Sequence, residues 1–152
     1  MHLTRIAAAL ALTAGLGITS MHAADASITA TINITNNASV TVYHAKNPPS
    51  TQSDSFVGVS GWLTAPPDSV LSGASNHAAQ ITLGANQEVT FYYGSPNANS
   101  IFSNYCAFTV KANSLGNGFQ RATGTPNNMV TTCSASLPSG QPYNVQVTLG
   151  GF

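Results

Sequence analysis

The sequence predicts an all-β protein, an antiparallel β-sandwich of about eight short strands with one disulfide. Apolar and polar residues alternate in several short runs, which is the period of a strand with one buried face. Glycine, proline, asparagine and serine separate these runs at regular intervals, as turns do. No helical period follows Ala26, and the chain contains only two cysteines, Cys106 and Cys133.

The N-terminal segment has the layout of a secretory signal peptide. Met1–Arg5 is a basic start, Ile6–Ile18 is an apolar run, and Ala24–Ala26 is a small-residue cleavage site. We therefore expect residues 1–26 to be removed, with cleavage slightly earlier or a retained anchor as alternatives. The apolar run is too short to span a membrane. The style of the segment is bacterial and predicts a secreted or periplasmic protein.

Residues 27–152 have the length of a single domain and almost no charge. Apolar residues make up 43% of the chain, which is not a disordered composition. The basic and acidic residues after Ala26 balance; they are Lys46, Lys111, Arg121, Asp54, Asp68 and Glu88. Three scattered cations cannot form a basic patch, so we expect no nucleic-acid partner. Attraction to anionic lipid by charge is equally unfavourable.

The first half of this domain begins with its clearest strand. In Ser27–Thr35 isoleucine or alanine alternates with threonine or asparagine. Asn36–Asn37 predicts a turn leading to a paired second strand at Val40–His44. Two prolines make Lys46–Asp54 a loop, and a short apolar run follows at Phe56–Val59.

The single tryptophan, Trp62, precedes a double proline at Pro66–Pro67. One interpretation is packing, in which Trp62 closes one end of the core and the prolines stiffen a crossover between sheets. The other is that an aromatic side chain on a rigid loop meets a partner or a membrane interface.

The second half predicts five further strands. They are Ala78–Leu83, Glu88–Tyr93, Tyr105–Ala112, Met129–Ala135 and Tyr143–Leu149. Gly84–Gln87 is expected to be a hairpin loop between the first two. The longest expected loop is Asn113–Asn128, within which Phe119 and Arg121 could add a short edge strand.

The two cysteines lie in two of these predicted strands. An exported chain meets an oxidising compartment, which favours a Cys106–Cys133 disulfide. The alternative, a pair of metal-binding thiolates, is disfavoured because neither cysteine has a histidine or second cysteine at ligand spacing.

Few residues could carry catalysis. The histidines and carboxylates of the domain are His44, His77, Asp54, Asp68 and Glu88, and they are scattered along the chain. The sequence contains no G-x-S-x-G elbow, phosphate loop, dinucleotide fingerprint or CxxC motif. We therefore expect no enzyme activity, no cofactor and no metal site.

Aromatic side chains are the remaining resource for binding. Tyr92 is expected to face outward, Phe102 and Phe119 lie at the edges of loops, and Trp62 joins them under the second interpretation above. On a neutral, hydroxyl-rich surface such rings can stack on sugars or enter a lipid headgroup layer. These four residues are the predicted ligand- or membrane-binding set.

One pattern resembles that of aegerolysin-like proteins and covers about half of the domain. Its residues are Gly61-Trp62, Pro66-Pro67, Val70, Gly73, Gly84 and Val89-Thr90-Phe91-Tyr92-Tyr93. Ile32–Asn36 followed by Val40 is also similar to that family's first hairpin. The family's Gly-x-x-Gly turn is reduced here to Gly84–Gln87, and the cysteine pair is no feature of the pattern. The resemblance implies a β-sandwich that recognises membrane lipid, in some members alongside a pore-forming partner.

The leading functional hypothesis is a non-catalytic β-sandwich that binds a membrane lipid or other surface ligand through its end loops, with Trp62 as anchor. A second hypothesis is a pilin-like structural or adhesive subunit, since Ser27–Thr35 or the C-terminal strand could complete a neighbour's sheet. A third is a periplasmic inhibitor or immunity protein, which the size and the disulfide allow.

Overall fold

The structure, a computed structural model, describes residues 26–45, 52–58, 61–75, 77–96, 101–137 and 139–152. The predicted signal peptide lies outside the described residues except for Ala26, as does the greater part of the predicted loop Lys46–Asp54. Within those ranges the chain contains no helix with the length and hydropathy needed to cross a membrane.

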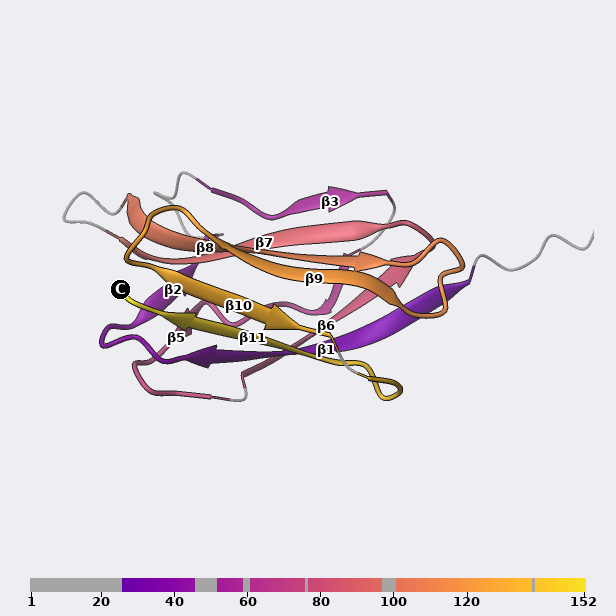
Figure 1. Ribbon diagram of the computed structural model, residues 1–152, viewed down its shortest axis with the longest axis horizontal. Coiled ribbons are helices and arrows are strands. Elements are labelled where there is room, and N and C mark those ends of the chain that lie inside the picture. Colours follow the sequence, from indigo (N-terminus) through magenta and orange to yellow (C-terminus); the bar gives the residue numbers. More distant parts are fainter. Residues whose placement is uncertain (1–25, 46–51, 59–60, 76, 97–100, 138) are drawn as a thin grey trace, which may run out of the picture.

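The described chain forms two sheets that pack face to face (Figure 1). One is five-stranded, in the order β10-β11-β1-β6-β4; the other is six-stranded, in the order β5-β2-β7-β8-β9, with β3 paired to β7. The strands are β1 (Ser27–Asn36), β2 (Val42–His44), β3 (Ser55–Val57), β4 (Gly61–Thr64), β5 (Ser69–Val70), β6 (His77–Gly84), β7 (Glu88–Pro96), β8 (Phe102–Ala112), β9 (Phe119–Pro126), β10 (Thr132–Ser136) and β11 (Asn144–Gly150). The predicted β-sandwich is confirmed, with more strands than expected.

The alternation of the sequence explains how the two sheets meet. Ile32 and Ile34 of β1 are fully buried. The residues that alternate with them, Thr31, Asn33 and Thr35, are half-buried. Facing strands supply Phe91 of β7 and Phe108 of β8, both with no exposed surface. Each strand thus presents one apolar face to a shared core, which the hydrophobic effect stabilises.

The prediction of a wholly antiparallel sandwich is wrong for one pair of strands. β1 and β11 are parallel, in a register that runs from Thr31 opposite Asn144 to Asn36 opposite Leu149. The alternation of apolar residues is the same in parallel and antiparallel strands with one buried face, so it could not distinguish them. The pairing places the first strand of the domain in the middle of a sheet.

The predicted hairpin at Asn36–Asn37 does not form, because β1 and β2 belong to different sheets. Asn36 is fully buried and holds this corner with its side chain. Its amide donates to the carbonyls of Val40 and Val70 at 2.8 and 2.9 Å, and its Oδ1 accepts from Ala38 N–H at 2.9 Å. A buried asparagine with these bonds turns the chain across the core instead of back along the same sheet.

Gly84–Gln87 is likewise a crossing between sheets and not the predicted hairpin loop, since β6 and β7 lie in different sheets. Gln87 closes the turn twice, with its N–H on Gly84 O at 3.1 Å and its Oε1 accepting from Gly84 N–H at 2.8 Å. Asn86 has φ 60°, a left-handed conformation that asparagine tolerates better than most residues.

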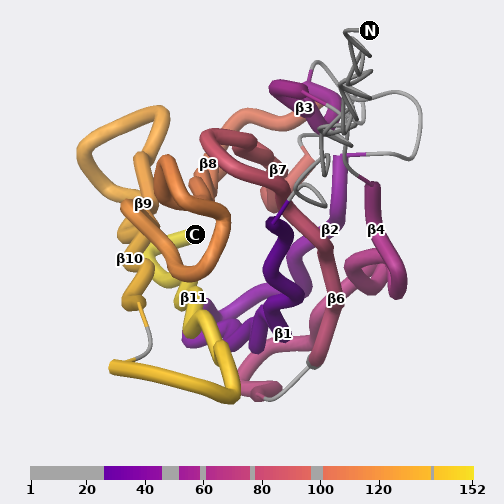
Figure 2. Tube along the Cα trace, turned by 90° about the vertical axis from the view of Figure 1, so that its right-hand side faces the viewer, coloured from indigo at the N-terminus to yellow at the C-terminus, as the bar shows by residue number. Residues whose placement is uncertain are grey.

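Half of the long loop predicted at Asn113–Asn128 is strand β9. β9 pairs with β8 from Cys106 opposite Pro126 to Ala112 opposite Phe119. Gly124 lies against β10, and a Cβ there would be 2.8 Å from the carbonyl carbon of Cys133. Seen end-on, β9 and β10 run side by side although they belong to different sheets (Figure 2). Only glycine permits this approach, which brings β9 and β10 together at one flank of the sandwich.

The predicted disulfide is confirmed. Cys106 of β8 is bonded to Cys133 of β10, with their Cα atoms 5.7 Å apart. Because β8 and β10 belong to different sheets, the bridge ties the two layers together beside the β9–β10 contact. These are the only two cysteines of the sequence, so neither thiol is left free.

Candidate functional site

One end of the sandwich exposes apolar side chains and forms the candidate site. Met129 is fully exposed, and Val130 and Leu71 are 67% and 65% exposed. Val40 and Ile101 are exposed to a smaller extent. We call these five residues the apolar end. They come from four connecting segments, so neither a single strand nor a single loop accounts for the surface.

Met129 and Val130 project from a turn that asparagine side chains hold in place. Asn128 Oδ1 accepts the N–H groups of Val130 and Thr131 at 3.1 and 2.9 Å. Asn127 Oδ1 accepts from Tyr105 N–H at 2.8 Å, which fixes the turn to β8. These bonds take the amides of residues 130 and 131 out of any ladder, so the strand predicted from Met129 begins only at Thr132.

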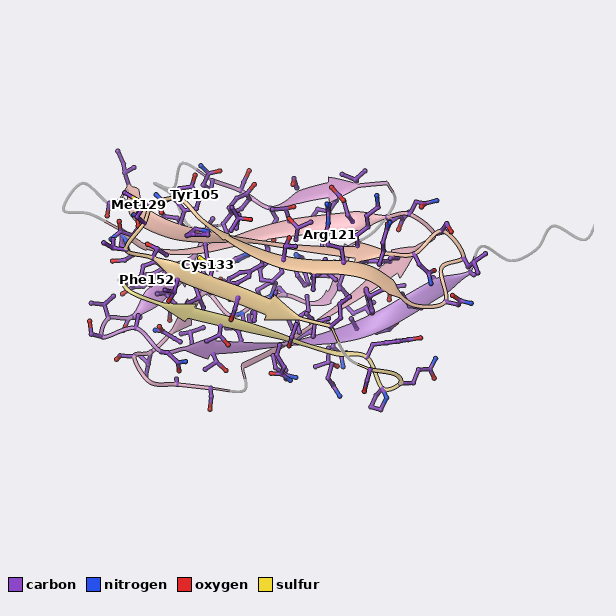
Figure 3. The ribbon with its side chains drawn as sticks, viewed as in Figure 1. Tyr105, Arg121, Met129, Cys133 and Phe152 are labelled. Atoms are coloured by element: carbon purple, nitrogen blue, oxygen red, sulfur yellow. A yellow bond between two sulfur atoms is a disulfide. The ribbon has the colours of Figure 1, made fainter. Side chains whose placement is uncertain are left out.

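Hydrogen bonds and close packing join the other segments to this turn. Ser39 Oγ donates to Phe152 O at 3.4 Å, and Ser72 Oγ donates to Ala38 O at 2.7 Å. Gly151 has φ 72°, and a Cβ there would collide with Val130 O. In Figure 3 the labelled Met129, Tyr105 and Phe152 lie together at this end. The apolar residues are therefore displayed on a fixed surface.

The charged residues of β7, β8 and β9 lie away from the apolar end. The four segments that carry the residues of the apolar end, together with the adjoining residues 151–152, contain no Asp, Glu, Lys or Arg; they are 37–41, 71–75, 101–104 and 127–131. Glu88, Lys111 and Arg121 lie opposite one another on β7, β8 and β9, near the other end of those strands. Arg121 donates to Glu88 Oε2 at 3.1 Å. That end also exposes Val57 and Leu115, so the apolar end is distinguished by the lack of charge in its segments.

A second cluster, formed by His44, Asp54 and Trp62, lies at the edge of the core. His44 Nε2 donates to Asp54 Oδ1 at 2.9 Å, and Trp62 Nε1 donates to Asp54 Oδ2 at 2.9 Å. The His44 side chain is fully buried, and that of Asp54 is 10% exposed. Both carboxylate oxygens are therefore occupied, and the carboxylate links β2 to β4.

Tyr93 packs beside this cluster, with its ring 5.2 Å from that of His44. Its hydroxyl donates to Pro67 O. Burial, and then the negative charges of Asp54 and Asp68, raise the pKa of Tyr93 far above its usual range. The phenol therefore stays protonated and acts as a hydrogen-bond donor, which suits a structural role.

The four aromatic residues predicted to bind a ligand are not brought together. Phe102 is buried at 7% exposure, so its predicted position at an exposed loop edge is wrong: it is the first residue of β8 and points inward. Trp62 is half-buried, with its ring edge-on to Phe91 at 5.4 Å. These contacts fit the packing interpretation of Trp62.

The remaining two predicted residues, Tyr92 and Phe119, are half-buried, and each packs against a tyrosine ring. The ring of Tyr92 lies edge-on to Tyr105 at 6.2 Å, and that of Phe119 lies edge-on to Tyr143 at 5.3 Å. The first pair joins β7 to β8, and the second joins β9 to the residue before β11. They do not form a common surface with Trp62.

Sequence reasoning missed the apolar end because it assigned Met129 and Val130 to a strand. The signal was present in the asparagine pair Asn127–Asn128 that precedes them. Asparagine side chains commonly bond backbone groups two or three residues on, which ends a ladder and exposes the next residues.

Removing the Asp54 carboxylate is expected to destabilise the fold. Asp54→Ala leaves the N–H groups of His44 and Trp62 without their acceptor, at a cost of about 2–3 kcal/mol in the free energy of unfolding. Urea unfolding monitored by Trp62 fluorescence measures this change. The matched control is Asp68→Ala, the same truncation in an exposed turn, with an expected change within about 0.5 kcal/mol. Equal losses in the two variants would contradict a structural role for the cluster.

Comparison with known proteins adds no family to these observations. No protein-family model matches the chain, and no curated protein matches it in sequence. The resemblance to aegerolysin-like proteins remains a prediction. Within the described residues, no group of three or more histidine, cysteine or acidic side chains is arranged to hold a metal ion.

Proposed function

We propose that this protein is an exported, non-catalytic β-sandwich that attaches to a lipid bilayer through its apolar end. The observation that carries the proposal is the exposure of Met129 and Val130 at the tip of a hydrogen-bonded turn. An apolar pair held in water by rigid backbone is unfavourable by itself and becomes favourable when covered.

The interfacial region of a bilayer suits this surface better than a charged partner does. Full burial of a methionine, valine or leucine side chain is worth about 1.5–3 kcal/mol each, and shallow insertion gains part of that. The segments of this end bring no charged side chain with them, so insertion incurs no cost for removing a charge from water.

The neutral surface distinguishes this mode of attachment from electrostatic adsorption. Binding by apolar insertion does not require anionic lipid and is not screened by salt. The charged row on β7, β8 and β9 would stay in water, which sets the orientation of the sandwich on the bilayer.

Export supports the same function. The disulfide is the chemistry of an oxidising compartment, and the predicted signal peptide leads there. We propose a secreted or periplasmic location, where the apolar end meets the outer surface of a membrane. A partnership with a pore-forming protein is implied only by the aegerolysin-like resemblance.

Sedimentation with vesicles tests the proposal. The chain from residue 27 is expected to sediment with phosphatidylcholine vesicles, with or without sterol and sphingomyelin, and addition of salt or anionic lipid is expected to leave binding unchanged. Met129→Ser combined with Val130→Ser is expected to weaken binding about tenfold or more. Trp62 fluorescence is expected to stay unshifted, because its indole packs on Phe91 and Asp54.

The matched control is Leu115→Ser. Leu115 is about as exposed as Val130, but it lies in the β8–β9 turn at the other end of the sandwich. This variant is expected to bind as the unmodified protein does. Absence of sedimentation with every vesicle, or equal loss in both variants, would refute attachment through the apolar end. Formation of detergent-resistant polymers would instead favour the surface-subunit hypothesis.

A further inference from the structure

β1 has one edge that is only partly covered. Along its whole first part it pairs with β6, from Ser27 opposite Gly84 to Ala30 opposite Ile81. On the other edge the ladder to β11 begins only at Thr31. Ser27–Ala30 therefore have a neighbouring strand on one side and none on the other.

A groove of about 270 Å³ lies beside this open edge. Four residues of β1 form one side of it, and three residues before β11 form the other; they are Ser27, Ile28, Thr29 and Thr31, and Gln141, Pro142 and Tyr143. Tyr143 is held in place, since its hydroxyl donates to Asn117 O at 2.6 Å and its ring packs edge-on against Phe119. The wall of the groove is thus fixed before anything binds.

The backbone of β1 offers hydrogen bonds into this groove. Thr31 N–H donates toward this side, to Tyr143 O at 2.9 Å. In a strand, the backbone groups of alternate residues point to the same side, so the N–H and C=O of Thr29 face the groove as well. Within the described ranges no backbone group pairs with Thr29 on that edge.

We propose that this groove binds an extended, uncharged peptide segment of another protein, which pairs with Thr29 and adds a short strand beside β1. Backbone pairing supplies the affinity in such strand addition, and the adjoining side chains supply the selection. All seven side chains that line the groove are uncharged, so a neutral segment fits.

This site is separate from the apolar end. Ser27 begins β1, whereas Asn36, at the other end of the strand, bonds the segment that carries Val40. A peptide in the groove leaves Met129 and Val130 uncovered. Vesicle binding and peptide binding can therefore succeed or fail independently.

Backbone NMR of the chain from residue 27, titrated with two short capped peptides, tests the proposal. One peptide alternates threonine with valine and the other alternates serine with leucine. At least one is expected to shift the amide signals of Thr29, Thr31 and Tyr143 and to slow hydrogen exchange at Thr29. The same peptides N-methylated at alternate residues cannot pair along one edge and are expected to bind about tenfold more weakly or worse.

Two variants locate the binding edge. Thr29→Lys places a charge in the groove, as natural sheet edges do to prevent pairing, and is expected to weaken binding about tenfold. Thr82→Lys is the matched control, because Thr82 bonds the Thr29 hydroxyl at 2.9 Å from β6 but does not line the groove. The proposal would be overturned if neither peptide caused a shift, or if binding survived N-methylation. It would also be overturned if the trisaccharide maltotriose, and neither peptide, shifted the amide signal of Tyr143.

Discussion

Replacing both cysteines by alanine is expected to lower the free energy of unfolding by about 3.5 kcal/mol, the chain-entropy value for a loop of this length. The cysteines are 27 residues apart in the sequence, and the bridge joins the two sheets across the core. Without it, the unfolded chain regains the freedom of that loop. Cys106 is also fully buried, so its truncation leaves a small cavity in addition.

Urea unfolding of the double variant, compared with the unmodified protein with and without reductant, measures this loss. The reduced protein is expected to unfold at nearly the same urea concentration as the double variant, since both lack the cross-link. A midpoint that reductant does not move, together with two titratable thiols in the denatured protein, would show that the bridge does not form in solution.

The bridge was predictable because a chain with two cysteines allows only one intrachain pairing, and the signal-peptide pattern predicts an oxidising compartment. The strands were predictable for a similar reason. In Ser27–Thr35, Glu88–Tyr93 and Cys106–Ala112 the alternation along the sequence is matched by alternating burial in the structure. A local pattern was sufficient where the structure depends on one buried face.

The connections between strands could not be predicted in the same way. A turn at Asn36 or at Gly84–Gln87 can lead back along the same sheet or across to the other, and the alternation on either side is unchanged. The choice depends on tertiary contacts such as the bond that the Asn36 amide donates to Val70 O and the bond that Ala112 N–H donates to Gln87 O. For the same reason, the local sequence does not determine which strands pair with β11.

The candidate site shows the same limit. Trp62 is conspicuous in the sequence as the only tryptophan, yet its contacts with Asp54, in the preceding loop, and with Phe91 of β7 became visible only in the structure. Met129 was inconspicuous because its exposure results from the asparagine bonds of a turn. Rarity of a residue type was therefore a poor guide to exposure.

The other large effect is expected from Phe91→Ala, at about 3–5 kcal/mol in the free energy of unfolding. Phe91 is fully buried, and its ring lies 5.4 Å from Trp62, 5.5 Å from Phe108 and 6.5 Å from Tyr93. Truncation removes the central ring of an aromatic cluster that joins β4 to β7 and β8. A close-packed core relaxes only in part around such a gap, so the cavity adds to the lost burial.

Phe56→Ala is the control, because it is the same truncation and also removes an edge-on contact with Trp62, at 6.1 Å. Phe56 is 36% exposed on β3, so its loss is expected to cost about 1 kcal/mol. Urea unfolding monitored by Trp62 fluorescence reports both variants from a ring that each phenylalanine contacts. A cost for Phe56→Ala as large as that for Phe91→Ala would mean that Trp62 is held from its outer side. A cost below about 1.5 kcal/mol for Phe91→Ala would mean that the two sheets close over the gap, since a collapsing site loses less than a rigid one.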